Sequence, residues 1–323
     1  MKHFGTTATG QDVHALTLQD GDLAVTVLTW GATVQDVRLA GIDRSLTLGS
    51  DRLSDYEGDM RHHGSLIGPI ANRISTARVK IDGMMYELER NQDGRIHLHS
   101  GAQATHRRLW QLADHSASHV VLTCDLADGD SGLPGNRTIT ATFRVSGKTL
   151  HLDVTGTTDA DTLMNFANHS YWNFDGTPRW DGHVLQVAAD RYLPGNADLC
   201  PSGEIADVTG TDMDFRTPRA IAPNAPWLDN NFCLSDGPQP LREVLTLTGT
   251  SGVGMTVATD QPGIQVYDGR EAIRPGGAHY EGLAVEAQGW PDAPNNRAFP
   301  SIKVTAETPY RQATTYRFFA PQA

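Results

Sequence analysis

Cysteines and long apolar runs are both scarce in this sequence, and each absence narrows the class of protein. The three cysteines, Cys124, Cys200 and Cys233, lie far apart, form no Cys-x-x-Cys pair and cannot all be paired within one chain. Such usage is typical of a reducing compartment. No segment reaches membrane-spanning length, and the first eight residues contain one lysine but no apolar stretch. We therefore expect a soluble, cytoplasmic protein.

Basic residues are outnumbered and nowhere concentrated in a run. The 323 residues include 26 Lys and Arg against 38 Asp and Glu, which gives a net charge of −12. Nucleic acid and anionic membrane surfaces attract basic patches, so neither is expected as a partner. A neutral, polar small molecule fits this composition better.

Helical spacing of apolar residues is almost absent, and the alternation typical of strands replaces it. Residues 138–145 place Ile139, Ala141, Phe143 and Val145 on one face, and the alternation resumes at 150–154 after a turn, which predicts a hairpin. Similar runs occur at 23–30, 119–126, 183–188, 263–267, 301–306 and 314–319. The sequence thus predicts an all-β protein, a large antiparallel sandwich with few short helices.

Composition is even along the chain, with no linker, low-complexity stretch or fixed repeat. We expect one domain over residues 1–323, although this length also allows two. The proline-rich stretch 192–231 reads as a loop. Because Phe215, Trp227 and Leu228 within it need burial, we expect an ordered loop wall beside a site.

His97 and His99 are two residues apart, so in an extended strand both side chains would point to the same face. Such a pair can begin a metal site, with His62, His63 or Glu286 as further ligands. The spacing of these candidates is no recognisable metal signature, so we expect neither a metal nor a cofactor. A simple hydrogen-bonded role suits His97 better than His99.

Two further residues can supply an acid and a base. His169 lies in Asn-His-Ser-Tyr-Trp-Asn (168–173), where aromatic faces and amides suit a sugar, although a histidine held by its loop neighbours is the alternative. Glu286 follows an apolar stretch and is expected to close a strand at the mouth of a pocket, where burial would raise its pKa. An exposed surface carboxylate is the alternative. A histidine that gives a proton and a carboxylate that takes one can move two protons on one molecule.

Polar side chains elsewhere could hold such a molecule. Asn72 and Arg73 follow a glycine-containing segment, and an arginine in a pocket presents a fork of donors to oxygen atoms. Asp229 could accept from a sugar diol. A salt bridge at the rim for Arg73, and a turn cap for Asp229, are the alternatives.

In combination these segments resemble the aldose 1-epimerase (galactose mutarotase) family. The resemblance runs in order through Gly-Pro-Ile-Ala-Asn-Arg-Ile (68–74), His-Leu-His-Ser-Gly (97–101), Gly-Leu-Pro-Gly-Asn (132–136) and the segment 168–173. It continues through 189–194, 201–205, 214–216, 229–232, 262–267 and 286–295.

The resemblance implies a β supersandwich with a sugar in an open cleft. It implies that His169 protonates the ring oxygen and that Glu286 removes the anomeric hydroxyl proton. It further implies that the sugar is held by Asn72, Arg73, His99, Asp229 and Gln288. The implied partner is a small sugar, and a monomer and a homodimer are both open.

Four positions depart from the usual family pattern, namely Pro69, Ser100, Asn230 and Asn296. They leave the preferred sugar open. Three rival functions also stay open: an epimerase of hexose 6-phosphates, a carbohydrate-binding protein without activity, and a cupin-like metal enzyme that uses His97 and His99. The first would need a cluster of Arg and Lys for the phosphate, and the motif segments contain few besides Arg73.

Overall fold

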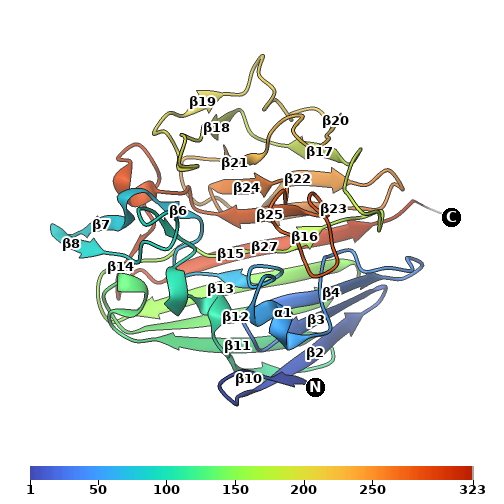
Figure 1. Cartoon of the computed structure of the whole chain (residues 1–323), viewed down its shortest axis with the longest axis horizontal. Helices are drawn as coiled ribbons and strands as arrows, with labels where there is room; N and C mark the ends of the chain where they lie inside the picture. The colour runs from blue at the N-terminus through green and yellow to red at the C-terminus, as the bar shows by residue number, and fades with distance from the viewer. Residues whose placement is uncertain (322–323) are drawn as a thin grey trace.

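Antiparallel strands dominate the regular secondary structure of the computed structural model (Figure 1). It describes residues 1–321, so the last two residues of the predicted domain lie outside it. Within that range all pairs of strands are antiparallel, and the isolated bridge between Ile70 and Asn165 is parallel. The predicted all-β class is confirmed.

One layer of the protein is a nine-stranded sheet. Its strands, in spatial order, are β10 (Gln111–His115), β11 (His119–Leu126), β12 (Arg137–Ser146), β13 (Thr149–Thr158), β27 (Tyr310–Phe319), β23 (Gly254–Thr259), β22 (Arg242–Thr248), β17 (Val184–Val187) and β20 (Arg219–Ala220). The alternation of apolar and polar residues buries every second side chain of β12, which is the pattern of a sheet with one face in the core. The predicted hairpin at 138–154 is confirmed as β12 and β13.

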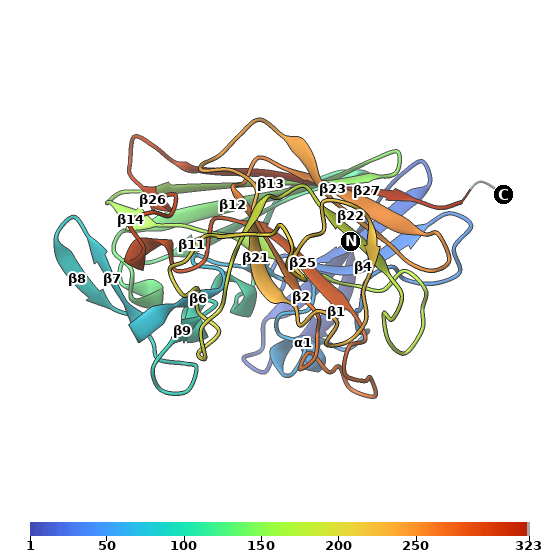
Figure 2. The ribbon, with the colours of Figure 1, turned by 90° about the horizontal axis from the view of Figure 1, so that it is seen from above.

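Two smaller sheets lie on the other side of the core (Figure 2). The first contains β1 (Lys2–Thr6), β2 (Asp12–Asp20), β3 (Leu23–Leu28) and β4 (Thr33–Leu39). The second contains β16 (Tyr171–Trp172), β25 (Leu283–Gln288), β24 (Gly263–Tyr267), β21 (Asp229–Cys233), β18 (Arg191–Leu193) and β19 (Ala206–Asp207). One core cluster joins all three sheets, from Leu16 to Phe318. This arrangement is the predicted sandwich.

Short strand pairs and helical turns fill the remaining connections. The pairs are β14 (Thr162–Leu163) with β26 (Lys303–Val304), β15 (Ala167–Asn168) with β5 (Leu66–Ile67), β6 (Arg73–Ile74) with β9 (His97–Leu98), and β7 (Arg78–Ile81) with β8 (Met84–Glu87). The helical elements are the short helix α1 (Leu53–Glu57) and the 3₁₀ turns Ser75–Ala77, Gly101–Gln103, Thr105–Arg107, Asp130–Gly132 and Ala293–Asn295. No helix among residues 1–321 is long and apolar enough to cross a membrane.

The stretch 192–231 is largely loop, as predicted, with three short strand segments and the start of β21. Phe215 and Leu228 are buried, but Trp227 is 39% exposed. The expectation that all three are buried is therefore wrong for Trp227. Its indole instead lies against the guanidinium of Arg270, at 3.7 Å from the ring centroid.

Gly64 lies in the segment before β5, packs closely against β4 and is hydrogen-bonded to residues 168–169. Its φ is +74°, and a Cβ on it would lie 2.1 Å from the carbonyl oxygen of Val34. Its amide donates to the carbonyl of His169 at 3.0 Å, and its carbonyl accepts from the side chain of Asn168 at 2.8 Å. Only glycine fits this position without a backbone shift.

We predict that Gly64→Ala destabilises the protein far more than Gly10→Ala. Gly10 has a similar φ of +83°, but nothing lies within 4 Å of an added Cβ. Both variants incur about 1–2 kcal/mol for the left-handed backbone, and Gly64→Ala adds roughly 1–3 kcal/mol for overpacking. Urea unfolding of both variants measures the difference, and equal losses would contradict the close approach.

Candidate active site

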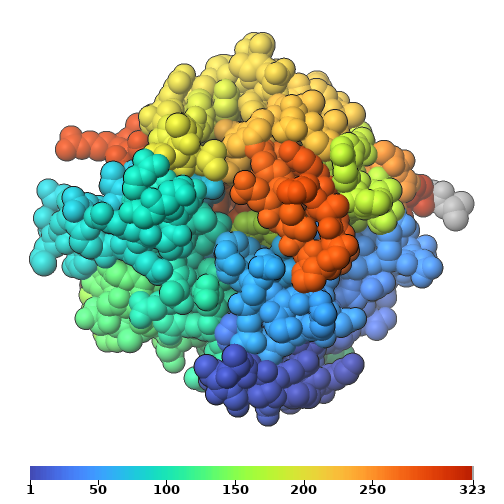
Figure 3. Space-filling model, in the orientation of Figure 1, coloured from blue at the N-terminus to red at the C-terminus, as the bar shows by residue number. Residues whose placement is uncertain are grey.

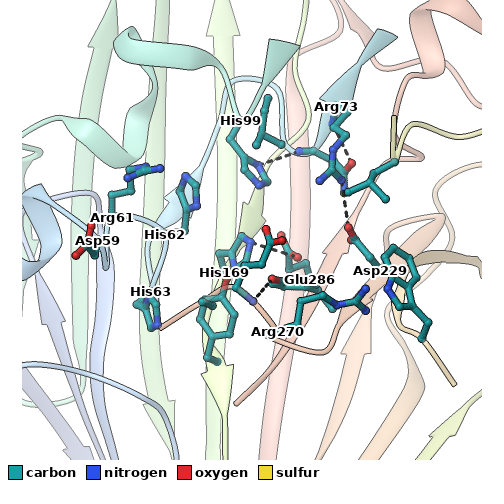
Figure 4. A pocket seen from close by; sticks show the side chains of 18 residues that line it. Asp59, Arg61, His62, His63, Arg73, His99, His169, Asp229, Arg270 and Glu286 are labelled. Atoms are coloured by element: carbon teal, nitrogen blue, oxygen red, sulfur yellow. Dashed lines mark hydrogen bonds and ion pairs between the residues drawn. The ribbon is translucent and has the colours of Figure 1, made fainter. Parts of the chain in front are cut away.

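A polar cavity of about 320 Å³ opens beside the β21–β24–β25 sheet. In the space-filling view the surface is hollowed beside the orange segment that precedes β25 (Figure 3). Residues far apart in the chain line this cavity, including His62, His63, Asn72, Arg73, His99, His169, Tyr171, Trp227, Asp229, Tyr267, Arg270 and Glu286. Histidine, arginine and carboxylate side chains together point into it (Figure 4).

His169 and Glu286 meet in this cavity. Nε2 of His169 lies 3.6 Å from Oε1 of Glu286, and the side chains are 5% and 2% exposed. His169 lies between β15 and β16, and its backbone amide donates to the carbonyl of Ser65 at 3.0 Å. Glu286 was expected to close a strand at the pocket mouth, but it lies inside β25, opposite Gln265 of β24. That expectation is wrong because β25 continues through Gln288.

Burial shifts the pKa values of the pair in opposite directions. Loss of solvation lowers the pKa of His169 to about 4. Loss of solvation, and secondly the carboxylate of Asp229, raise the pKa of Glu286 well above its usual 4.5, and Arg73 opposes this increase. A protonated His169 is therefore a stronger acid than histidine in water, and an ionised Glu286 is a stronger base than glutamate in water.

His97 and His99 do not share a face, so that prediction is wrong. The strand β9 ends at Leu98, and His99 adopts a left-handed conformation with φ of +51°, which breaks the alternation. The buried Nδ1 of His97 donates to the carbonyl of Glu89 at 2.8 Å, whereas His99 faces the cavity. Among residues 1–321, no group of three or more His, Cys, Asp or Glu side chains is arranged to hold a metal ion.

The tautomer of His99 follows from its contact with the backbone. The amide of Asn72 donates to Nδ1 of His99 at 3.1 Å, so in the neutral ring the proton is on Nε2. Burial, and then the nearby His169 and His106, lower the pKa of His99 well below 6.5. His99 therefore stays neutral and can donate one hydrogen bond from Nε2.

Arg73 and Asp229 line the end of the cavity that lies away from His62 and His63 (Figure 4). Nη1 of Arg73 lies 3.4 Å from Oδ2 of Asp229, and its Nε donates to the side-chain oxygen of Gln92 at 3.0 Å. The other carboxylate oxygen of Asp229 accepts from Nε2 of Gln265 at 2.7 Å. Asn72, Arg73, His99 and Asp229 thus line one cavity together with His169 and Glu286.

Gln288 does not line the cavity. It is buried two residues beyond Glu286 on β25, and its side-chain amide has no hydrogen-bond partner within the part of the chain that the structure describes. The sequence reasoning missed Gln265, which lies across the sheet from Glu286 and holds Asp229. The alternation of side chains along β24 could have identified it, because it places Gln265 on the same face as Tyr267, which lines the cavity.

None of the four departures from the family pattern lines the cavity. Ser100 is buried and exchanges hydrogen bonds with the backbone of Ile70, at 2.7 and 3.1 Å. The side-chain amide of Asn230 donates to the carbonyl of Leu193, and that of Asn296 to the carbonyl of Asp292. The carbonyl of Pro69 accepts from the amide of Asn165. These residues support the backbone around the cavity.

Comparison with known proteins identifies the family of this chain. The family model of aldose 1-epimerase matches residues 14–317. The chain is 30% identical to galactose mutarotase of Homo sapiens over 96% of this chain and 95% of that protein. It is also 30% identical to aldose 1-epimerase of Escherichia coli (strain K12), over 96% of each.

Solved structures agree as well. A GalM/aldose epimerase homologue from C. elegans superimposes with a TM-score of 0.88 at 26% identity, over 96% of this chain and 100% of that one. Galactose 1-epimerase from Lactobacillus acidophilus NCFM superimposes with a TM-score of 0.86 at 25% identity, over 99% and 98%. The chain therefore belongs to the aldose 1-epimerase family.

Proposed function

We propose that this protein is an isomerase, an aldose 1-epimerase that interconverts the α and β anomers of a free aldose such as galactose or glucose without a cofactor or metal. The contact between Nε2 of His169 and Oε1 of Glu286 supports this function most directly. The ring oxygen and the anomeric hydroxyl of a pyranose are bonded to the same carbon. An acid that serves one oxygen and a base that serves the other must therefore be close neighbours, as these two are.

In the proposed reaction, Nε2 of His169 gives its proton to the ring oxygen while Glu286 takes the proton of the anomeric hydroxyl. The bond between C1 and the ring oxygen breaks, and C1 becomes an aldehyde. Rotation about the C1–C2 bond presents the other face of the aldehyde. The ring then closes as Glu286 returns a proton to the oxygen on C1 and His169 takes the proton from the attacking hydroxyl.

The opposed pKa shifts of His169 and Glu286 support these roles. In water, moving a proton from imidazolium to carboxylate is unfavourable, because the usual pKa values are 6.5 and 4.5. Burial lowers the first to about 4 and raises the second well above 4.5, so the order of the two pKa values is reversed and transfer of a proton from His169 to Glu286 becomes favourable. Positioned acid and base groups contribute typically ~10²–10⁴-fold each to a rate.

We further propose that Asn72, Arg73, His99 and Asp229 hold the sugar hydroxyls. Asp229, fixed between Arg73 and Gln265, offers carboxylate oxygens to a diol, and His99 offers a donor. Gln288 was expected to hold the sugar as well. It is buried outside the cavity lining, so its proposed part is limited to the buried polar surroundings of Glu286.

A free sugar is favoured over a hexose 6-phosphate. A phosphate dianion needs a cluster of unpaired guanidinium or ammonium groups. Of the three arginines in the cavity lining, Arg73 is paired with Asp229 and Arg270 with Asp268, and within residues 1–321 Arg61 alone has no ion pair. The lining also contains the acidic residues Asp59 and Glu271. A passive sugar-binding role needs no acid and base in contact, so the His169–Glu286 pair favours an enzyme.

We also propose that residues 1–323 form one domain that works as a monomer or homodimer in the cytoplasm. The core cluster from Leu16 to Phe318 supports a single domain. Cys124, Cys200 and Cys233 are buried free thiols, which suits a reducing compartment.

We predict that His169→Asn and Glu286→Gln each lower kcat for freshly dissolved α-galactose or α-glucose by about 100-fold or more, because each removes one proton partner. Polarimetry measures the rate, and thermal unfolding confirms that the variants fold. The exposed Glu243, whose carboxylate pairs with Arg317, provides the control Glu243→Gln, which should keep full activity. Rates near that of the wild type for either site variant would refute the assignment. A marked preference for galactose 6-phosphate would favour the rival substrate.

We predict a bell-shaped dependence of kcat/KM on pH, because the pair is active with one proton. The acid limb lies near pH 4, where the pair takes up a second proton at His169. The alkaline limb lies above pH 4.5, where the pair loses its last proton, since the pKa of Glu286 is raised. Asp229→Asn removes a negative charge that raises the pKa of Glu286, so it should move the alkaline limb to lower pH. Polarimetry corrected for the uncatalysed reaction measures both limbs, and a shift to higher pH would contradict this electrostatic coupling.

A further inference from the structure

Four imidazole rings gather at the end of the cavity away from Asp229. The ring of His62 lies 4.9 Å from His99, 5.0 Å from His106 and 5.7 Å from His169, measured between centroids. It is nearly parallel to the ring of His169, at an interplanar angle of 23°. His62 comes from the segment between α1 and β5, and the proposed reaction gives it no part.

His62 differs from its histidine neighbours in the access to its ring nitrogens. Within residues 1–321, both ring nitrogens of His63 and the Nδ1 atoms of His106 and His169 are closed off from solvent without a hydrogen-bond partner, but neither ring nitrogen of His62 is. Its side chain lines the cavity, and no described residue hydrogen-bonds to its ring. The polar edge of His62 is therefore available to a molecule in the cavity.

The charge state of His62 limits what it can recognise. Burial, and then the nearby His99, His106 and His169, lower its pKa well below 6.5, so the ring is neutral at pH 7. A neutral imidazole has one donor and one acceptor, which matches a hydroxyl group. It offers no charge to a carboxylate or phosphate. The ligand chemistry that His62 itself matches is therefore that of an uncharged hydroxyl.

The direction of the sugar ring follows from the proposed function, on which this inference rests. His169 serves the ring oxygen and Glu286 serves the hydroxyl on C1, so C1 is on the Glu286 side of the ring oxygen. The other neighbour of the ring oxygen, C5, is on the far side. Figure 4 shows that His62 and Glu286 lie on opposite sides of His169, and that Asp229 and Arg73 lie on the same side as Glu286. His62 is therefore on the side of C5.

We propose that the His62 imidazole hydrogen-bonds the exocyclic hydroxyl on C6 of the substrate and so determines the preference of the enzyme for hexoses over pentoses. A pentopyranose has only hydrogen atoms on C5 at this place. It would leave the polar edge of His62 without its partner. A polar site that loses its partner discriminates against the shorter sugar.

The test compares sugars that differ only in this group. D-Galactose and L-arabinose share their ring hydroxyl arrangement and differ by the CH₂OH group, as do D-glucose and D-xylose. Polarimetry gives kcat/KM for all four with the wild type, His62→Phe and His62→Gln. His62→Phe keeps a ring without polar atoms, and His62→Gln keeps one donor and one acceptor.

We expect His62→Phe to lower kcat/KM for each hexose by about 3- to 10-fold, the effect of one neutral hydrogen bond, and to leave the pentose values within about 2-fold. His62→Gln should recover part of the hexose-to-pentose ratio. His115→Phe removes an imidazole that is exposed on β10 and lies outside the cavity, so its ratio should match that of the wild type.

Two results would overturn this inference while leaving the proposed function intact. Equal losses for hexoses and pentoses would show that His62 supports the site rather than C6, and an unchanged ratio in both His62 variants would show that it does not contact that group. A wild-type protein inactive on all four sugars would instead overturn the proposed function, and this inference with it.

Discussion

The site depends on keeping an imidazole and a carboxylate in contact and away from water. Burial of His169 and Glu286 disfavours the charged form of each, and this is also what makes one a better acid and the other a better base. A buried ion pair stabilises a protein little, because lost solvation offsets the attraction between the charges. The contact is therefore better explained by chemistry than by stability, and the large core carries the stability.

The backbone around the cavity is built to hold these side chains. Gly64 and His169 are joined by a backbone hydrogen bond, which attaches the segment of His62 to that of the proposed acid. Asn72 and His99 both adopt left-handed conformations, with φ of 62° and 51°, and the amide of one sets the tautomer of the other. Left-handed residues other than glycine are uncommon and often occur at functional sites. Their backbone is strained where the polar groups are placed.

Regular strands were predictable, and departures from regularity were not. The alternation in 119–126 and 263–267 predicted β11 and β24 with their observed bounds, since one face of each strand meets the core. The same alternation failed for His97 and His99, because a single left-handed residue rotates the second ring away from the first. Gln265 was missed for another reason: its role depends on the register of β24 with β21, which carries Asp229, and with β25, which carries Glu286.

The sequence alone determined the fold class, the family resemblance and the two residues suited to move protons, because alternation and residue chemistry are local properties of the chain. Only the tertiary structure decided that Nε2 of His169 lies 3.6 Å from Oε1 of Glu286, that Gln265 holds Asp229, and that His62 lines the same cavity. These features arise where residues from separate strands and loops converge, and the register between strands and the few left-handed backbone positions set their geometry.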